Sequence, residues 1–446
     1  MEFKSAGALY DFLKGAVKES GKAMEVVDEA RLRASIDSVI WNAVFNPDKE
    51  VLSAARRVIR LSAASLGIRP ASIQGLYTAM GRAEVKGFTV PAVNIRGLTF
   101  DTARAFFRSA KRHNAGAFIF EIAKSEIEYT GQRPSEYAVC CIAAAVKEGY
   151  RGPVFIQGDH FQINAKNFAR DKNAEIEGLK KLIKEAIDAE FYNIDIDSST
   201  VVDLGKPLVT EQQRPNFETT ALLTGFIRAN EPKGVTVSVG GEIGEVGGKN
   251  STEEELRAFM DGYIKAIKKG NAGISKISIQ TGTSHGGVVL PDGTIAKVKV
   301  DFDTIERLSK AAREIYGLAG VVQHGASTLP DDAFGIFPKR GTAEVHLATG
   351  FQNMVYDSAA FPPDLRKEIY KHLADKHSGE RKAGETDEQF YYKTRKKGFG
   401  PFKERIWDMD EKRRVRIGEE LEARFDLIFE KLNAVNTAGH VKKHVG

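Results

Sequence analysis

From residue 88 onward, short apolar runs alternate with stretches of amphipathic helical pattern. Eight of the runs are apolar along their length, as strands buried on both faces of a parallel sheet are. In chain order they are FTVPAVNI, GAFIFEIA, GPVFIQGDH, FYNIDIDSS, GVTVSVGGEIGEVGG, ISKISIQTGTSHGG, AGVVQHGAS and AEVHLATGFQN. Eight such units in about 270 residues predict an α/β protein, a (β/α)8 TIM barrel. A doubly wound open sheet is the alternative, disfavoured because no Gly-x-Gly-x-x-Gly follows the first strand.

The segments that flank this alternation have other patterns. Residues 1–83 carry three stretches of helical pattern and predict a helical N-terminal extension to a barrel at 84–361. Residues 362–446 predict a charged helical insertion, up to residue 418, and then a closing amphipathic helix, all packed on the barrel. Because the charges of the insertion alternate in sign, a solvated helical surface is favoured over a nucleic-acid-binding patch.

The composition is that of a globular protein. Of the 446 residues, 42% are hydrophobic and 28% are charged, and the net charge of +5 is small. The apolar runs fall short of the roughly 18 to 20 residues that a membrane span needs, and the first residues lack a secretory pattern. We therefore expect a cytoplasmic protein that binds neither membranes nor nucleic acid. The adjacent Cys140 and Cys141 match no disulfide or metal spacing, which predicts buried structural thiols.

In a parallel barrel, reactive side chains lie where each strand ends and its loop begins. This rule selects eight polar residues: Asn94, Asp159, His160, Asp197, Glu242, His285, His324 and His346. A single histidine at such a place is more often a hydrogen-bonded core residue than a ligand. Three imidazoles from different strands, with an open coordination position, are instead a catalytic zinc arrangement. We expect His160, His285 and His324 to form it.

Carboxylates and small residues complete the predicted site. Asp159, next to His160, is suited to proton transfer beside the metal. Asp197 and Glu242 also stand at strand ends and supply carboxylates to the same end of the barrel. The alternative for these two residues is a salt bridge within the barrel. The sequences SHGG at 284–287 and HGAS at 324–327 place small residues beyond two of the histidines, where bare backbone amides can wrap a phosphate.

Taken together, these stretches resemble the class II, metal-dependent fructose-bisphosphate aldolase family. The resemblance covers residues from about 73 to 435, and its ordered set of motifs is far more specific than any one of them. The motifs are VPAVN, GDH, IDIDSS, GEIGEVGG, TSHGG with the downstream VDFDTIERL, HGAS, RIW and FEKLNA.

The resemblance implies a role for each matching residue. His160, His285 and His324 would hold the catalytic zinc ion, and Asp197 with Glu242 would form a second metal position. Asp159 would donate and accept the proton at the substrate oxygen. The residues that match substrate or phosphate contacts are Asn94, Gly286, Gly325, Ser327, Thr349 and Arg405. Of these, the arginine would reach across a dimer interface. A monovalent cation would assist the reaction.

The implied activity is a reversible, zinc-dependent cleavage of a ketose bisphosphate, as in glycolysis and gluconeogenesis. Fructose 1,6-bisphosphate would yield dihydroxyacetone phosphate and glyceraldehyde 3-phosphate through an enediolate that the metal stabilises as a Lewis acid. We expect a small-molecule sugar phosphate as the substrate and a homodimer or a higher homo-oligomer as the assembly.

Four departures from the family pattern affect substrate choice. His346 stands in place of asparagine, Ala348 in place of a polar or acidic residue, and Ala123 in place of a serine. The loop at Lys249–Asn250 lacks the family's acidic residues; Glu245 or the glutamates at 253–255 are the candidates to replace them.

Three roles are open for His346. It is a donor to substrate hydroxyls, a fourth metal neighbour, or a residue of the barrel layer. For the function of the chain, the main alternative to a fructose-bisphosphate aldolase is a related class II aldolase that acts on another phosphorylated or anionic sugar. A zinc hydrolase and a non-catalytic scaffold are the remaining ones.

Overall fold

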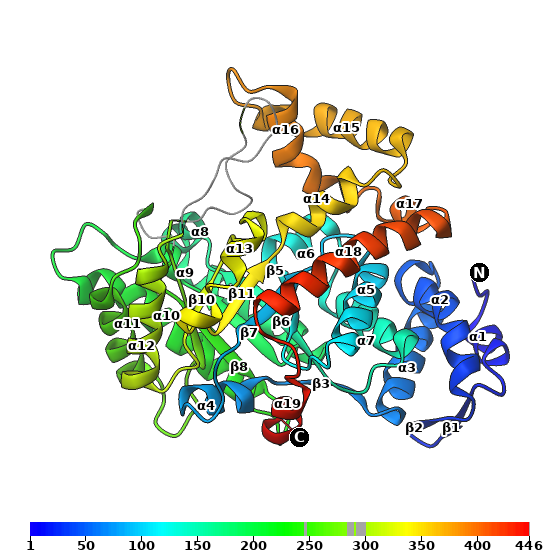
Figure 1. The fold of residues 1–446 in the computed structure, drawn as a ribbon, viewed down its shortest axis with the longest axis horizontal. Helices are drawn as coiled ribbons and strands as arrows, with labels where there is room; N and C mark the ends of the chain where they lie inside the picture. Colours follow the sequence, from blue (N-terminus) through cyan, green and yellow to red (C-terminus); the bar gives the residue numbers. More distant parts are fainter. Residues whose placement is uncertain (245–247, 283–289, 291–299, 446) are drawn as a thin grey trace.

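Eight parallel strands form a closed barrel in the computed structural model, which describes residues 1–244, 248–282, 290 and 300–445 (Figure 1). Each strand pairs with the next, and the last returns to the first. The strands are β4 (Val90–Asn94), β5 (Ile119–Ala123), β6 (Gly152–Gln162), β7 (Asn193–Asp197), β8 (Ser238–Glu242), β9 (Lys276–Ile279), β10 (Val321–Gln323) and β11 (Glu344–Leu347). Seven lie inside the predicted runs and β6 extends two residues beyond its run, so the predicted (β/α)8 barrel is confirmed.

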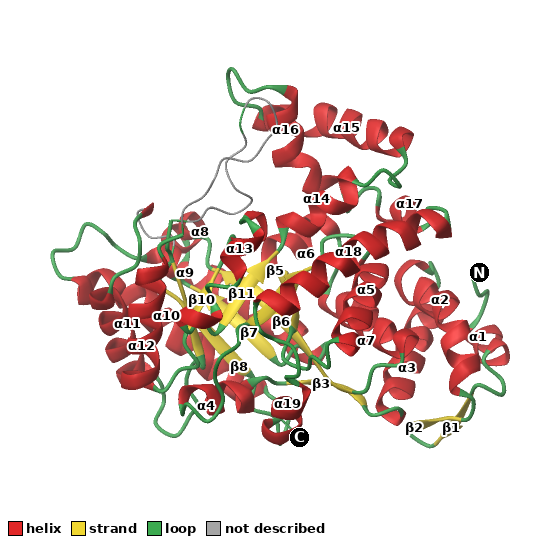
Figure 2. Cartoon of the chain, viewed as in Figure 1, coloured by secondary structure: helices red, strands yellow, loops and turns green. Residues whose placement is uncertain are grey.

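Helices surround the barrel, as Figure 2 shows. They follow the strands in order: α5 (Thr99–Arg112), α6 (Lys124–Thr130), α7 (Pro134–Glu148), α8 (Ala165–Arg170), α9 (Lys172–Asp188), α10 (Val209–Asn230), α11 (Glu253–Ala266), α12 (Phe302–Tyr316), α13 (Asp331–Phe334) and α14 (Thr349–Asp357). Because the helices cover the outer face and side chains fill the interior, every residue of β4, β5, β7 and β8 is buried.

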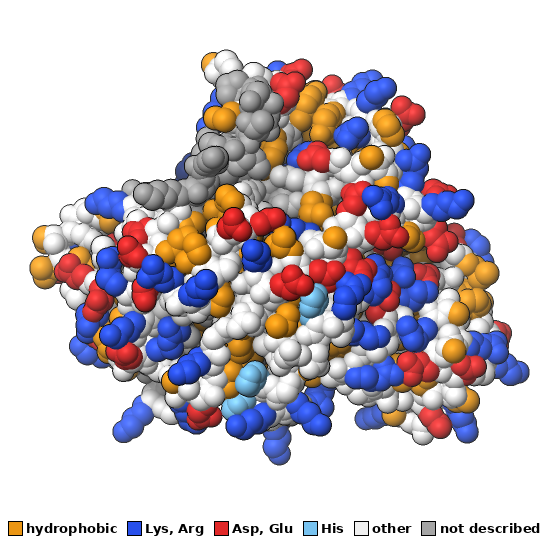
Figure 3. Space-filling model, in the orientation of Figure 1, with side chains coloured by type: hydrophobic (Ala, Val, Ile, Leu, Met, Phe, Trp, Pro, Cys, Tyr) orange, Lys and Arg blue, Asp and Glu red, His pale blue; other side chains and the backbone are white. Residues whose placement is uncertain are grey.

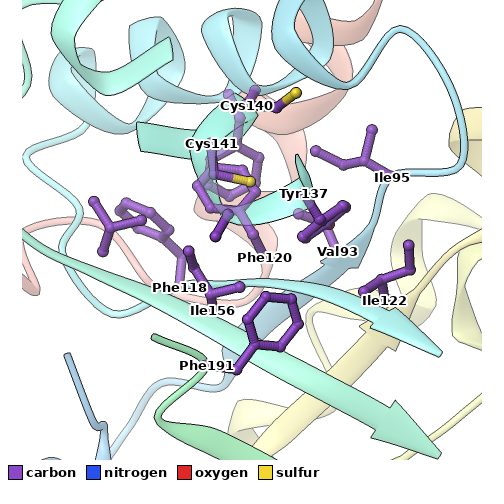
Figure 4. Close-up of a cluster of buried hydrophobic side chains, with 14 of the residues drawn as sticks. Val93, Ile95, Phe118, Phe120, Ile122, Tyr137, Cys140, Cys141, Ile156 and Phe191 are labelled. Carbon is purple, nitrogen blue, oxygen red and sulfur yellow. The ribbon is translucent and has the colours of Figure 1, made fainter. Parts of the chain in front are cut away.

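A cluster of aromatic and aliphatic side chains joins the barrel to α7 (Figure 4). Phe120 from β5 and Ile156 from β6 are fully buried in it together with Phe191. Cys140 and Cys141 of α7 are unpaired thiols buried in the same cluster. Burial raises the pKa of both thiols, so they remain neutral packing groups. The prediction of buried thiols is confirmed.

The chain before the barrel contains α1 (Ala6–Phe12), α2 (Glu29–Phe45), α3 (Lys49–Ser65) and α4 (Gln74–Gly81). The predicted helical extension at 1–83 also contains three short strands. A hairpin, β1 (Val17–Ser20) and β2 (Ala23–Val26), separates α1 from α2, and β3 (Ile68–Ala71) adds to the barrel sheet beside the start of β6. These strands are four residues long each, too short for periodicity to reveal.

After the barrel come α15 (Pro363–His377), α16 (Asp387–Thr394), α17 (Lys403–Trp407), α18 (Glu411–Lys431) and α19 (Ala438–His444). The long helix α18 lies against α5 (Figure 1). Ion pairs such as Arg108 with Glu422 join the two helices, and Figure 3 shows acidic and basic side chains intermingled on this face. In the part of the chain that the structure describes, no helix is long and apolar enough to cross a membrane.

Candidate active site

A cavity of about 560 Å³ opens at the carboxyl ends of the barrel strands. Its walls come from the ends of β4, β5, β6, β10 and β11, from α6, and from the 3-10 turn η6 (Arg395–Gly398) that follows α16. Five of the strand-end residues selected from the sequence line it: Asn94, Asp159, His160, His324 and His346. In a parallel barrel this end is where reactive groups gather.

Two histidines and a carboxylate face one another beside this cavity. His160 Nδ1 lies 3.2 Å from Glu242 Oε2, and His324 Nδ1 lies 3.6 Å from Glu242 Oε1. The centres of the two imidazole rings are 4.1 Å apart. One donor atom from each of the three residues falls within 4.8 Å of the others. Imidazole nitrogen and carboxylate oxygen are ligands of zinc and related divalent ions, so the set fits such an ion.

A bulge in β6 directs the side chains of two consecutive residues, Asp159 and His160, into the cavity. The register against β7 shifts between Gly158 and Phe161, and His160 has a φ of +39°. Consecutive residues of a regular strand point to opposite faces, so without the bulge only one of Asp159 and His160 would reach the cavity. Gly158 is required here, since a Cβ at this position would lie 2.5 Å from the Phe161 ring.

Asp197 lies behind the histidine pair. Its Oδ2 is 3.1 Å from His160 Nδ1, and its Oδ1 accepts hydrogen bonds from the backbone and hydroxyl of Ser199. A carboxylate in this position fixes the orientation of the imidazole. Burial alone would raise the pKa of Glu242, but His160 and His324 lower it below its usual range. The site therefore holds a fixed negative charge next to two imidazoles.

Asp159 is held through both of its oxygens. Oδ2 accepts from Asn94 Nδ2 at 2.9 Å, and Oδ1 lies 3.1 Å from His346 Nδ1. Asn94 is itself fixed by a second hydrogen bond to Glu126. Burial opposes ionisation, yet the histidines at 160 and 346 lower the pKa of Asp159 well below its usual range. The carboxylate is consequently ionised and able to accept a proton.

His346 connects the cavity to the barrel interior. Its Nε2 lies 2.5 Å from Glu344 Oε1, on the same strand. Burial lowers its pKa, but Asp159 and Glu344 outweigh this and raise the pKa of His346 to about 9. His346 lines the cavity as well as contacting Asp159. Donor atoms of Asp159, His324 and His346 also fall within 4.8 Å of one another.

The loops after β10 and β11 form the other wall of the cavity. Gly325 has a φ of +67°, in the left-handed region that favours glycine. Ser327 Oγ accepts from the backbone amide of Gly350 at 3.1 Å, which ties the loop to the first turn of α14. Thr349 Oγ1 accepts from Arg96 Nη1 at 3.2 Å. Small residues, hydroxyls and a helix N-terminus together suit an anionic group.

The sequence reasoning missed the basic side chains of the cavity: Arg96, Lys124 and Lys396. Arg96 is paired with Glu126 at 2.6 Å, but among the described residues no ion pair includes Lys396. Burial, and then the nearby Arg96, lower the pKa of Lys396. Arg96 follows the VPAVN strand directly and could have been found. Lys396 comes from the charged insertion, and its sequence position gives no indication of its place.

The remaining residues singled out from the sequence have different outcomes. His285, Gly286 and Glu245 fall outside the described residues. Arg405 is 54% exposed and pairs with Glu368, away from the cavity of its own chain. The glutamates at 253–255 form the first turn of α11, where Glu255 caps the helix. Ala123 and Ala348 both line the cavity.

The model of the family described as fructose-bisphosphate aldolase class-II matches residues 75–407. This chain belongs to that family. The matched range includes Asp159, His160, Glu242 and His324, and membership of this family implies a lyase. No curated protein sequence matches the chain.

Several solved structures resemble this chain. A probable tagatose 6 phosphate kinase from Sinorhizobium meliloti is 15% identical over 80% of this chain and 93% of its own, with a TM-score of 0.51, which agrees with the barrel fold. A fructose-bisphosphate aldolase from Campylobacter jejuni is 19% identical over 83% and 97%, with a TM-score of 0.47. The YdjI aldolase from Escherichia coli is 14% identical over 77% and 98%, with a TM-score of 0.44.

Proposed function

We propose that this chain is a zinc-dependent aldolase that reversibly cleaves a ketose bisphosphate, with fructose 1,6-bisphosphate as the first candidate substrate. The observation that carries the proposal is the meeting of His160, Glu242 and His324 beside an ionised Asp159. A single cavity thus combines a set of metal-binding side chains with a proton acceptor. His285 is proposed as a further ligand on the family pattern alone.

The donor set defines what a metal would contribute. A divalent ion held by these residues would polarise the substrate carbonyl and stabilise the negative charge that cleavage places on the adjacent carbons. Asp197 would keep the His160 ring in the orientation that binding requires, since its carboxylate already contacts that ring. A second divalent ion at Asp197 and Glu242 stays a proposal, as does an assisting monovalent cation.

Asp159 would carry the proton transfer. In the cleavage direction it accepts the proton of the C4 hydroxyl as the C3–C4 bond breaks, and the C4 oxygen becomes the aldehyde. In the condensation direction it returns that proton. Asn94 and His346 hold the carboxylate so that it does not have to reorient during the reaction.

The phosphate groups would bind at two places. Gly325, Ser327 and the N-terminus of α14 offer backbone and hydroxyl donors to one of them. Lys396 also lines the cavity and offers a positive charge near Arg96. Arg405 is exposed, in accord with a proposed role across a homodimer interface.

A related class II aldolase for another phosphorylated or anionic sugar is the second candidate. The observation that favours it is the cavity wall itself, where Ala123, His346 and Ala348 replace the residues that the family pattern places there. These changes alter hydrogen bonding to substrate hydroxyls and phosphate but leave the metal-binding set and Asp159 in place.

A panel of ketose mono- and bisphosphates tests the proposal. Purified protein, supplied with zinc, should release a triose phosphate from at least one of them, and Asp159→Asn should abolish that release while the protein still binds zinc. If no member of the panel yields a triose phosphate, the aldolase proposal fails.

A further inference from the structure

A layer of charged side chains fills the barrel directly below the active-site mouth. Lys276 on β9 is 1% exposed, and its Nζ lies 2.9 Å from Asp195 Oδ2 on β7. Its ammonium group also pairs with Glu344 on β11, which is fully buried. Gln157 on β6 donates to Glu344 Oε1 at 2.9 Å and accepts from Lys276 at 2.8 Å. Side chains from four barrel strands thus form one buried network, in which Lys276 and Gln157 contact the Glu344 carboxylate.

The backbone is shaped to admit this layer. Gly240 on β8 faces it, and a Cβ there would lie 2.3 Å from Asp195 Oδ1 and 3.0 Å from the Lys276 side chain. From below, the hydroxyl of Tyr77 on α4 donates to Glu344 Oε2. Both oxygens of Glu344 are therefore engaged, one by Tyr77 and the other by Lys276, Gln157 and His346.

We propose that Glu344 and Lys276 are positioning residues, which orient the Asp159 carboxylate through the His346 imidazole. This inference rests on the proposed function, because it assigns Asp159 the proton transfer. The residues form one continuous series of contacts, from Lys276 to Glu344, from Glu344 to His346 Nε2, and from His346 Nδ1 to Asp159 Oδ1.

The arrangement constrains the imidazole at both ends. Each ring nitrogen faces a carboxylate oxygen, at 2.5 Å on the Glu344 side and 3.1 Å on the Asp159 side. A buried carboxylate that binds one nitrogen of a histidine fixes the direction of the other. Because Glu344 is held by two further strands and by α4, it cannot follow His346 if the ring rotates. The direction from which His346 meets Asp159 is therefore set from inside the barrel.

A purely structural role would make a different prediction. Buried ion pairs are weak contributors to stability when well-packed apolar groups could replace them, so the burial of this network of polar side chains in a barrel interior calls for a further reason. The reason here is their connection to Asp159. An error in the placement of a reacting group costs up to about 100-fold in rate, whereas a structural cluster should affect stability and leave kcat unchanged.

The decisive variant is Glu344→Gln, which keeps the side-chain shape and removes the carboxylate. We expect kcat for triose phosphate release to fall by about 10- to 100-fold, with KM and zinc content unchanged. Glu231→Gln is the matched control: Glu231 forms a partly buried ion pair with Arg228 at 2.7 Å, outside the cavity. It should leave kcat unchanged.

The double variant Lys276→Met/Glu344→Gln removes both charges and guards against a misfolded single variant. If the two residues act through the same contact, the double variant should be no slower than the slower of Glu344→Gln and Lys276→Met. An unchanged kcat in Glu344→Gln would overturn the proposal. So would a loss of zinc in that variant, since the network would then serve the metal site instead.

A readout independent of catalysis separates this proposal from the proposed function. In zinc-loaded protein labelled with 15N-histidine, the His346 ring signals, assigned by their absence in His346→Asn, should shift in Glu344→Gln and stay in place in Glu231→Gln. This holds even if the wild-type protein cleaves no sugar phosphate. Unmoved His346 signals in Glu344→Gln would overturn the positioning role whatever the activity.

Discussion

His346 Nδ1 lies 3.1 Å from Asp159 Oδ1 at the base of the active-site cavity. The two residues come from β11 and β6, 187 positions apart in the chain. The resemblance to the class II family implies asparagine where this chain has His346, so the contact joins the proposed proton acceptor to a position at which this chain departs from the family pattern. The contact between His346 and Asp159 is therefore the first one to test by mutation.

Replacing His346 with asparagine should reduce kcat about tenfold or more, because Asp159 loses the contact at one of its two oxygens. Zinc content should stay the same, measured by elemental analysis of the purified protein. His113→Asn is a matched control, since His113 also faces a carboxylate, Asp426 at 3.1 Å, but lies outside the cavity. A loss of zinc in His346→Asn would instead identify His346 as a metal ligand.

Asp197→Asn should weaken zinc binding by about 10- to 100-fold, because the His160 ring loses the carboxylate that orients it. Competition against a chromophoric zinc chelator measures this affinity directly. The control is Asp426→Asn, which removes a carboxylate from a histidine remote from the metal-binding set. Equal zinc affinities in the wild type and Asp197→Asn would contradict the orienting role.

Lys396→Met should raise KM for a phosphorylated substrate about tenfold or more with a smaller change in kcat, because a charge-assisted contact to one phosphate is lost. The neighbouring Lys397 is a close control: it pairs with Glu380 at 2.5 Å and does not line the cavity. Steady-state kinetics of Lys396→Met and Lys397→Met should differ. If both variants match the wild type, Lys396 takes no part in phosphate binding.

Metal-free protein should lose stability as the pH rises from about 6.5 to about 9. Asp159 and Glu344 outweigh burial and raise the pKa of His346 from 6.5 to about 9, so in this range the folded state keeps a proton that the unfolded chain has released. The contribution is fully present below pH 6.5, amounts to at most about 3 kcal/mol, and disappears as the pH passes through 9.

Denaturant unfolding in the presence of a chelator at several pH values measures this slope. His346→Asn removes the titrating group and should show a flatter dependence over the same range. A wild-type stability that rises between pH 6.5 and 9 would contradict the assignment of this proton to His346.

The barrel itself could be predicted from the sequence, because eight uniformly apolar runs separated by amphipathic stretches indicate strands buried on both faces. The strand-end rule also found Asp159, His160, Glu242 and His324. It could not show that a bulge in β6 brings Asp159 and His160 to the same side. A local distortion of this kind has no periodic pattern.

Two further features were missed, for different reasons. Lys396 reaches the cavity from a segment far along the chain, and its placement depends on tertiary packing. The charged layer did leave a trace, since Lys276 and Glu344 are charged residues inside runs predicted to be buried strands. A charged residue within a strand buried on both faces needs a buried partner, and that reasoning would have paired the two residues.

Cleavage of fructose 1,6-bisphosphate, with and without a chelator and with zinc restored, tests the central claim most directly. We predict that triose phosphate release disappears when the metal is removed, returns with zinc, and is absent throughout in Asp159→Asn. Release that persists in fully metal-free protein, or that survives Asp159→Asn unchanged, would contradict the proposed chemistry at this site.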